Sequence, residues 1–344
     1  MKLIGIPVEE KNTSLSARVL VFLLASVFTS LGSAQELRLD PSKVQGPDAC
    51  GECHKNSLNS WKETHHATSF KSLPRSDKGR EIAKKMGLKR IKAGSDCLTC
   101  HFTSAVVEDK TSAIAGTSCE SCHGAGTDWV DIHSDFGGKG VKAENEDPEH
   151  KITRYAKSEA AGMIRPSDLY KLAENCYQCH TVPNENLVNV GGHPAGSQFE
   201  LVRWTQGEVR HNVWYTEANN EAPLERRRMM FIVGQAIDLE FALRGVAKAT
   251  KPEKYAKSMA KRAAIARKRI AAVSQLVDIP ELKEITEVGK SAKLKLNNEV
   301  ELIKAAEAVS AATKKLATNY DGSTLEPIDS MLPSADKYKG KPSP

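Results

Sequence analysis

Aromatic side chains are scarce in this sequence of 344 residues, where phenylalanine, tyrosine and tryptophan together make up 6%. A core built mainly from aromatic side chains is therefore not the obvious design. Long hydrophobic runs are also missing after the N-terminus, and a membrane-spanning helix needs about 20 apolar residues. The remaining composition, 40% hydrophobic and 27% charged, is ordinary for a soluble protein of about two domains.

The N-terminus has the pattern of an export signal. Lys11 and Arg18 precede an apolar run over residues 19–28, and small residues follow up to Ala34. A charged start, an apolar run of about ten residues and a small-residue end are typical of a cleaved signal peptide. We expect cleavage near Ala34 and a periplasmic or otherwise exported protein without a membrane span. An uncleaved N-terminal anchor is the alternative.

Cysteine is absent outside one repeated pattern. All eight cysteines fall into four pairs, each with two residues between the thiols and a histidine directly after the second. The motifs are Cys50-Gly-Glu-Cys53-His54 (motif 1), Cys97-Leu-Thr-Cys100-His101 (motif 2), Cys119-Glu-Ser-Cys122-His123 (motif 3) and Cys176-Tyr-Gln-Cys179-His180 (motif 4). This is the attachment pattern of c-type haem, in which the thiols bond the haem vinyl groups and the histidine reaches the iron.

Structural zinc and disulfides are the alternative uses of paired cysteines in an exported chain. Neither requires a histidine after the second cysteine. Histidine supplies 10 of the 344 residues, so four such coincidences are improbable. The sequence predicts four covalently bound haem c groups in a mainly helical domain with little regular sheet, in which haem replaces much of the core.

The second axial ligand of each haem iron distinguishes electron carriers from catalysts. An iron with two protein ligands only passes electrons, whereas an iron with an open position can also bind small molecules. No methionine stands in an obvious ligand context, although Met163 stays open. Six histidines lie outside the motifs: His65, His66, His133, His150, His193 and His211. Ligation mostly by two histidines would imply low-to-moderate reduction potentials.

The residues around the motifs resemble the tetrahaem cytochrome c-554 family, typified by the electron acceptor of hydroxylamine oxidoreductase. The resemblance covers roughly residues 48–182. It rests on the stretch from Cys50 to His66 with Trp61, on Gly116 to Gly126 followed by His133, and on Asp96 and Asn175 before motifs 2 and 4. It implies electron transfer between redox proteins, with His133 as distal ligand of the first haem and His66 of the fourth.

The other histidines are less specific. His65 would point about 100° away from His66 on a helix and is expected at the surface. His150 lies in a charged, solvated loop. His193, in a glycine-rich turn, and His211 are both candidate distal ligands, and one of them would serve the third haem. In the family the second haem has no distal protein ligand, whereas four candidate histidines would allow this chain to close it.

The C-terminal part has a different composition. Apolar residues at spacings of three and four predict amphipathic helices packed antiparallel. One helix covers residues 226–243, a second runs from Pro252 towards Val277, and a third runs from Pro280 through Leu316. Residues 221–318 hold 20 Lys/Arg against 12 Asp/Glu, a net charge of +8, whereas residues 35–220 come out near −2.

The predicted organisation is a signal peptide (1–34), a tetrahaem domain (35–220), a basic helical domain (221–318) and a poorly ordered tail (319–344). The basic helices suit either an acidic partner or a solvated face, and their few aromatics argue against nucleic acid. The predicted function is electron relay between redox proteins. The alternatives are an enzyme that reduces a small nitrogen oxide at an open iron, and a conductive or structural oligomer formed through residues 221–318.

Overall fold

The computed structural model describes residues 37–93, 96–213 and 218–343. The predicted signal peptide, residues 1–34, lies outside these ranges. Within them, no helix is long and apolar enough to cross a membrane.

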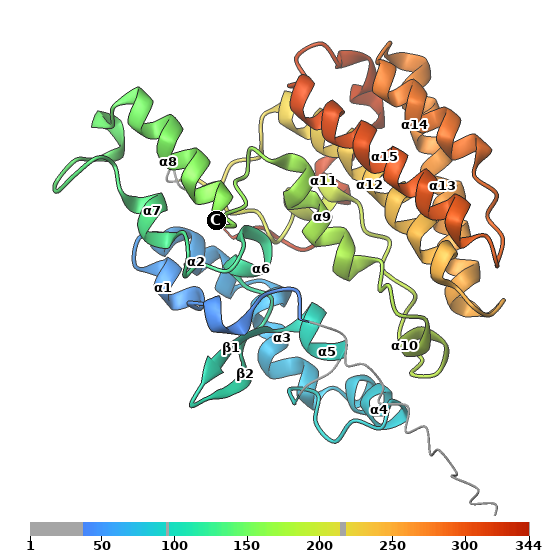
Figure 1. The fold of residues 1–344 in the computed structure, drawn as a ribbon, viewed down its shortest axis with the longest axis horizontal. Helices are drawn as coiled ribbons and strands as arrows, with labels where there is room; N and C mark the ends of the chain where they lie inside the picture. The colour runs from blue at the N-terminus through green and yellow to red at the C-terminus, as the bar shows by residue number, and fades with distance from the viewer. Residues whose placement is uncertain (1–36, 94–95, 214–217, 344) are drawn as a thin grey trace, which may run out of the picture. The chain divides into compact units, whose positions relative to one another are not determined.

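The described chain is mainly helical, as predicted (Figure 1). Its N-terminal elements are η1 Pro41–Lys43, α1 Pro47–Gly51, α2 Lys55–Lys62, α3 His65–Ser72, η2 Leu73–Arg75, α4 Asp77–Lys85, α5 Asp96–His101, β1 Thr103–Val107, β2 Lys110–Ala115, α6 Cys119–His123, α7 Val130–Ser134, η3 Ala143–Asn145, α8 Pro148–Ala160, α9 Leu169–His180, α10 Glu185–Asn189 and α11 Leu201–Thr205. Its C-terminal elements are α12 Leu224–Lys248, α13 Lys254–Leu276, α14 Pro280–Ser291, α15 Glu299–Asn319, η4 Glu326–Met331 and η5 Ala335–Lys337.

The sheet of the described chain is a single antiparallel hairpin of β1 and β2, joined by Glu108 and Asp109. Both turn residues have positive φ, 48° and 60°, which matches the twist of a tight hairpin. The hairpin connects α5 to α6, so it links motif 2 to motif 3.

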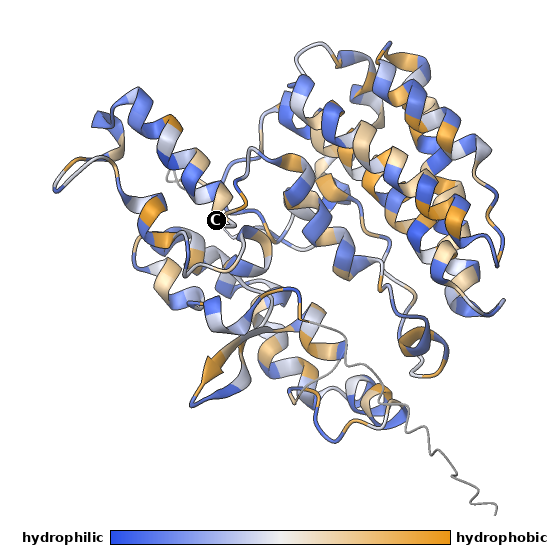
Figure 2. Cartoon of the chain, viewed as in Figure 1, coloured by the Kyte–Doolittle hydropathy of each residue, from blue (hydrophilic) through white to orange (hydrophobic). Residues whose placement is uncertain are grey.

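The four C-terminal helices lie side by side as the predicted antiparallel bundle (Figure 1). In Figure 2 apolar and polar residues alternate along these helices, as amphipathic packing requires. Helix α12 is the central one and packs against α9, α11, α13 and α15. It is buried over most of its length because its neighbours cover it on several sides.

Buried charges on α12 are paired, as burial in an apolar core demands. Arg228 pairs with Asp329, Asp238 with Arg262 on α13, and Glu240 with Arg244. The hydrophobic core extends from Leu169 to Ile328, so it joins α9–α11 to the bundle.

Two expectations for the C-terminal part were wrong. The predicted third helix is interrupted: α14 ends at Ser291 and α15 begins at Glu299. Asn297, with a φ of 56°, lies in the turn between them, and α15 packs on α14 and α12, which buries its apolar face. The segment after residue 319 is also packed rather than loose, because Leu325 and Ile328 are 2% and 0% exposed in the core.

The region before Leu169 has little apolar core of its own. Its one hydrophobic cluster among the described residues consists of Ala83, Ile91, Leu98 and Phe102. A region of this length normally buries more apolar surface than that. The deficit fits a region whose interior is completed by a large apolar cofactor.

Candidate haem-binding sites

The four motifs lie on helices or at their ends. Motif 1 begins in the last turn of α1, motif 2 lies in α5, motif 3 forms α6 and motif 4 ends α9. On a helix, residues three and four positions apart share a face. The spacing within each motif therefore directs both thiols and the imidazole to the same side, as one flat macrocycle requires.

Each motif histidine faces a second histidine from a distant part of the chain. The ring centres of His54 and His133 are 6.1 Å apart, and those of His101 and His193 are 6.2 Å apart. The other two pairs are His123 with His211 at 6.3 Å and His180 with His66 at 6.2 Å.

This spacing fits a metal ion held between two imidazoles. A metal–imidazole bond is about 2.0–2.1 Å long. Two such bonds, with the distance from each nitrogen to its own ring centre, account for the separation seen in all four pairs. The rings are nearly parallel in the pair of His54 and His133, at 16°, and nearly perpendicular in the pair of His123 and His211, at 84°.

Hydrogen bonds at Nδ1 orient several of these rings. The Nδ1 atoms of His123, His193 and His211 lie 2.9, 2.8 and 2.8 Å from the backbone carbonyls of Ile164, Pro194 and Val209. The Nδ1 of His180 lies 3.0 Å from the hydroxyl of Ser197. Metal-bound histidines usually donate their second ring nitrogen in this way, which leaves the other free for the metal.

His133 is oriented by its surroundings instead. Trp129 packs edge-on against its ring, at 5.8 Å between centres. Its Nδ1 is buried without a hydrogen-bond partner among the described residues. A buried polar atom of this kind is costly unless a further group satisfies it.

Burial keeps these imidazoles neutral, as metal ligation requires. It lowers the pKa of His101 and of His133 to about 4, and the pKa of His180 to about 3. It also lowers the pKa of His54, His66 and His123. These six rings therefore carry a free lone pair at neutral pH.

The geometry does not favour the alternative uses of cysteine. All eight thiols are free of disulfides. Among the described residues, no group of three or more His, Cys, Asp or Glu side chains is arranged to hold a metal ion. Each histidine pair instead contains the histidine that directly follows the two thiols of one motif, and this donor set fits haem c.

The thiols also show which motifs are neighbours. The thiol of Cys50 in motif 1 lies close to that of Cys119 in motif 3, and the thiol of Cys100 in motif 2 lies close to that of Cys179 in motif 4. Cys122 of motif 3 interacts electrostatically with Cys176 of motif 4. The attachment sites therefore follow each other in the spatial order 1, 3, 4, 2.

Arg38 helps to hold the motifs together, a role that the sequence alone did not predict. Its guanidinium donates to the backbone carbonyls of Asn175 and Ser121 at 3.1 and 3.2 Å, and so ties α9 to α6. It also interacts electrostatically with the thiols of motifs 2, 3 and 4. A lone arginine before the first motif gives no local signal of this position.

Glu120, inside motif 3, was also missed as a structural residue. Its carboxylate is buried and accepts hydrogen bonds from the backbone N–H groups of Gln45, Gly46 and Gly126 at 2.9, 2.8 and 2.7 Å. It thereby fixes the chain just before motif 1 against the loop after motif 3.

Gly116 sets the position of α3. A Cβ atom there would lie 1.9 Å from the carbonyl oxygen of His66, so only glycine permits this approach. The glycine before motif 3 thus places His66 opposite His180, which lies 114 positions further along the chain.

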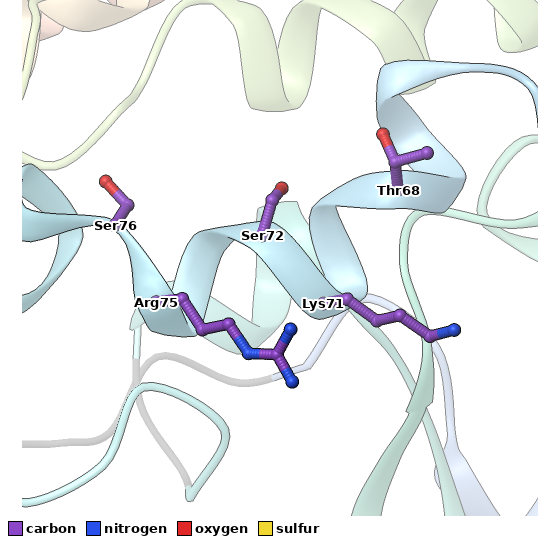
Figure 3. A pocket seen from close by; sticks show the side chains of 5 residues that line it. All are labelled: Thr68, Lys71, Ser72, Arg75 and Ser76. Carbon is purple, nitrogen blue, oxygen red and sulfur yellow. The ribbon is translucent and has the colours of Figure 1, made fainter.

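A cavity of about 430 Å³ lies against η2 and against α3, the helix that contains His66. Its lining residues are Thr68, Lys71, Ser72, Arg75 and Ser76. Figure 3 shows the three hydroxyls on one side of the helix and the two cationic side chains on the other.

The other two histidines stand outside the pairs. The side chain of His65 is 87% exposed and contacts Glu208, as expected for a surface residue. His150 was expected in a solvated loop. It lies in α8 instead, half-buried, and shares the buried carboxylate of Glu146 with Arg154. The backbone carbonyl of His133 accepts from Arg154 at 2.7 Å, so this cluster supports the position of His133.

A helical fold with repeated thiol–imidazole motifs and a second imidazole opposite each defines a c-type cytochrome with covalently bound haem c, a class of electron-transfer protein. Residues 49–124, which contain motifs 1 to 3, match the family model of cytochrome c554 and c-prime. Cytochrome c-554 of Nitrosomonas europaea is 27% identical over 166 residues, which span 46% of this chain and 66% of that protein. Both matches support the cytochrome c-554 family, which confirms the resemblance noted in the motifs. The matched part falls just short of two thirds of the relative's length. No solved structure matches the chain significantly.

Proposed function

We propose that this protein is an exported tetrahaem c-type cytochrome that relays electrons between redox proteins. The observation that carries the proposal is the set of four histidine pairs with nearly equal ring separations. When bound, each haem iron accepts or releases one electron. The cysteines Cys50, Cys53, Cys97, Cys100, Cys119, Cys122, Cys176 and Cys179 hold the four haems.

The eight paired histidines are the axial ligands in this proposal. His54, His101, His123 and His180 bind from the motif side, and His133, His193, His211 and His66 bind from the opposite side in the same order. Two neutral imidazoles on each iron favour low-to-moderate potentials and little change of ligation with oxidation state.

The pair of His101 and His193 bears on the choice between carrier and enzyme. The family resemblance implies an open second haem, whereas here an imidazole stands 6.2 Å from His101, as in the other pairs. A closed second site leaves no iron for a small nitrogen oxide to bind. This observation favours relay over the enzymatic alternative.

The spatial order of the attachment sites supports a linear relay. Motifs 2 and 1 lie at the two ends, and motifs 4 and 3 lie between them. Electron exchange with partners is therefore assigned to the end sites, and the closeness of neighbouring motifs keeps each step short. Export, with a signal peptide cleaved near Ala34, supplies the setting in which haem c is attached. The tetrahaem domain (35–220) performs the relay, and the basic helical domain (221–318) packs against it.

Electron paramagnetic resonance of the oxidised protein tests this function, together with haem content from mass spectrometry and the pyridine haemochrome assay. The expected result is four haems per chain, all low spin. The near-parallel pair should give a rhombic signal and the near-perpendicular pair a strongly anisotropic one. A high-spin signal worth one haem would reinstate an open iron, and fewer than four haems would contradict the assignment of the motifs.

A further inference from the structure

Helix α13 has an unusual charge distribution. Its sequence from Lys254 to Leu276 contains seven lysines and arginines and no aspartate or glutamate. On other helices some exposed lysines have acidic partners one turn away, as in the pairs of Lys85 with Glu81 and Lys290 with Glu287. Helix α13 offers its lysines no such neighbour.

The exposed lysines of α13 form one stripe. Lys254, Lys257, Lys261 and Lys268 fall within an arc of about 60° at 100° per residue. Ile265, 40% exposed, lies about 20° beyond Lys254, at the edge of this arc. Among the described residues, none of these lysines has an ion-pair partner. Like charges this close on a helix destabilise it. A role in stability therefore does not explain the stripe.

The stripe begins next to the second haem site. The Lys254 ammonium donates to the backbone carbonyl of His193 at 3.2 Å, and the Asn189 side chain accepts from the backbone N–H of Tyr255 at 3.0 Å. Val190, between these contacts, is 55% exposed. The lysine stripe and a small apolar spot thus adjoin the segment that faces His101.

We propose that the face of α13 formed by Lys254, Lys257, Lys261, Ile265 and Lys268, with Val190 at its end, is the docking surface for an acidic electron-transfer protein. This inference rests on the proposed relay function. It adds the class of the redox partner and the haem through which electrons enter, which is the second haem. A row of lysines beside a small apolar spot suits a transient redox complex, in which complementary charge raises the association rate. A single exposed isoleucine is too little apolar surface for insertion into a membrane.

Rapid-mixing kinetics of the full-length holoprotein test the docking surface. The electron donor is photoreduced flavodoxin, a small acidic flavoprotein, and the measured quantity is the second-order rate of haem reduction at several salt concentrations. The test variant is K261E/K268E. The matched control is K304E/K315E on α15, which changes the net charge equally at exposed lysines that have no ion-pair partner among the described residues.

The wild-type rate should fall as salt rises. The test variant should be slower by about tenfold or more at low salt, with a flatter salt dependence, whereas the control should stay within about threefold of the wild type. Carbodiimide cross-linking to flavodoxin should join its carboxylates to Lys257, Lys261 or Lys268.

Equal slowing of both variants would show that only net charge matters and would overturn the proposal. The proposal would also be overturned if the test variant reacted as fast as the wild type, or if flavodoxin did not reduce the wild type. Binding to phosphatidylglycerol vesicles that depends on α13, in place of binding to flavodoxin, would overturn it as well. Haem content and spin state of each variant are measured alongside. Four low-spin haems in a variant with unchanged kinetics would refute the docking surface and leave the relay function standing.

Discussion

Replacing His193 with alanine is the most direct perturbation of the proposed ligation. His193 faces His101 at 6.2 Å between ring centres, and its neighbour in the chain, Pro194, accepts the Nδ1 hydrogen bond. The substitution removes the imidazole and keeps the backbone carbonyl that Lys254 contacts. The expected effect is therefore confined to the second site.

The size of the effect follows from the pairing. One iron of four should lose its sixth ligand and become high spin, and the other three should keep their signals because their own pairs are intact. The thioether attachments to Cys97 and Cys100 should persist. Electron paramagnetic resonance measures the high-spin share, cyanide or nitric oxide should bind about one equivalent, and added imidazole should restore the low-spin state.

His65→Ala is the matched control, since His65 is 87% exposed and lies beside a paired histidine without being paired itself. It should leave all four irons low spin. An H193A protein that stays entirely low spin would remove His193 from the ligand set. Loss of low-spin signal at several haems would show that the residue supports the fold rather than a single iron.

Three further predictions follow from the contacts around the sites. The hydrogen bond from Arg154 lowers the pKa of Glu146 to about 2, below the ordinary 4.5. This carboxylate therefore stabilises the fold fully above pH 4.5, and its contribution is lost as pH falls through 2. High-spin haem, measured optically during acid titration, should therefore appear at a higher pH in E146Q than in the wild type. Arg262 donates to the carbonyl of Ser197, whose hydroxyl contacts His180, so R262M should lower the fourth haem's midpoint potential by on the order of tens of millivolts in a spectroelectrochemical titration, and R262M/D238N should lower it less. Leu302→Ala should reduce the free energy of unfolding by about 2–5 kcal/mol in denaturant titrations followed by circular dichroism, whereas Val300→Ala, at a position that is 78% exposed, should cost under about 0.5 kcal/mol.

The interruption between α14 and α15 shows where sequence patterns fail. Apolar spacing continues through Leu294 and Leu296, so periodicity alone predicts one helix. The chain turns at Asn297 because burial against α12 and α14 outweighs the local helical preference. The packed segment around Ile328 has the same explanation: its composition is that of a loose tail, and burial against the bundle orders it.

The sequence by itself determined the attachment chemistry of this protein. Two thiols and a histidine within five residues need only one helical turn to meet a single macrocycle, and that geometry is fixed by local backbone rules. The helical class followed from apolar periodicity, and the family from the residues beside the motifs.

Only the tertiary structure decided which distant histidine faces which motif. The path of the whole chain brings His66 to His180 and His101 to His193. Contacts at Gly116 and Arg38 help to hold this path, and the sequence around these two residues does not predict such contacts. Residues separated by about a hundred positions meet only when loop entropy is overcome by packing elsewhere, so spacing cannot predict their partners. For the same reason, the pairing of His101 with His193 and the lysine stripe beside it emerged from the fold rather than from the motifs.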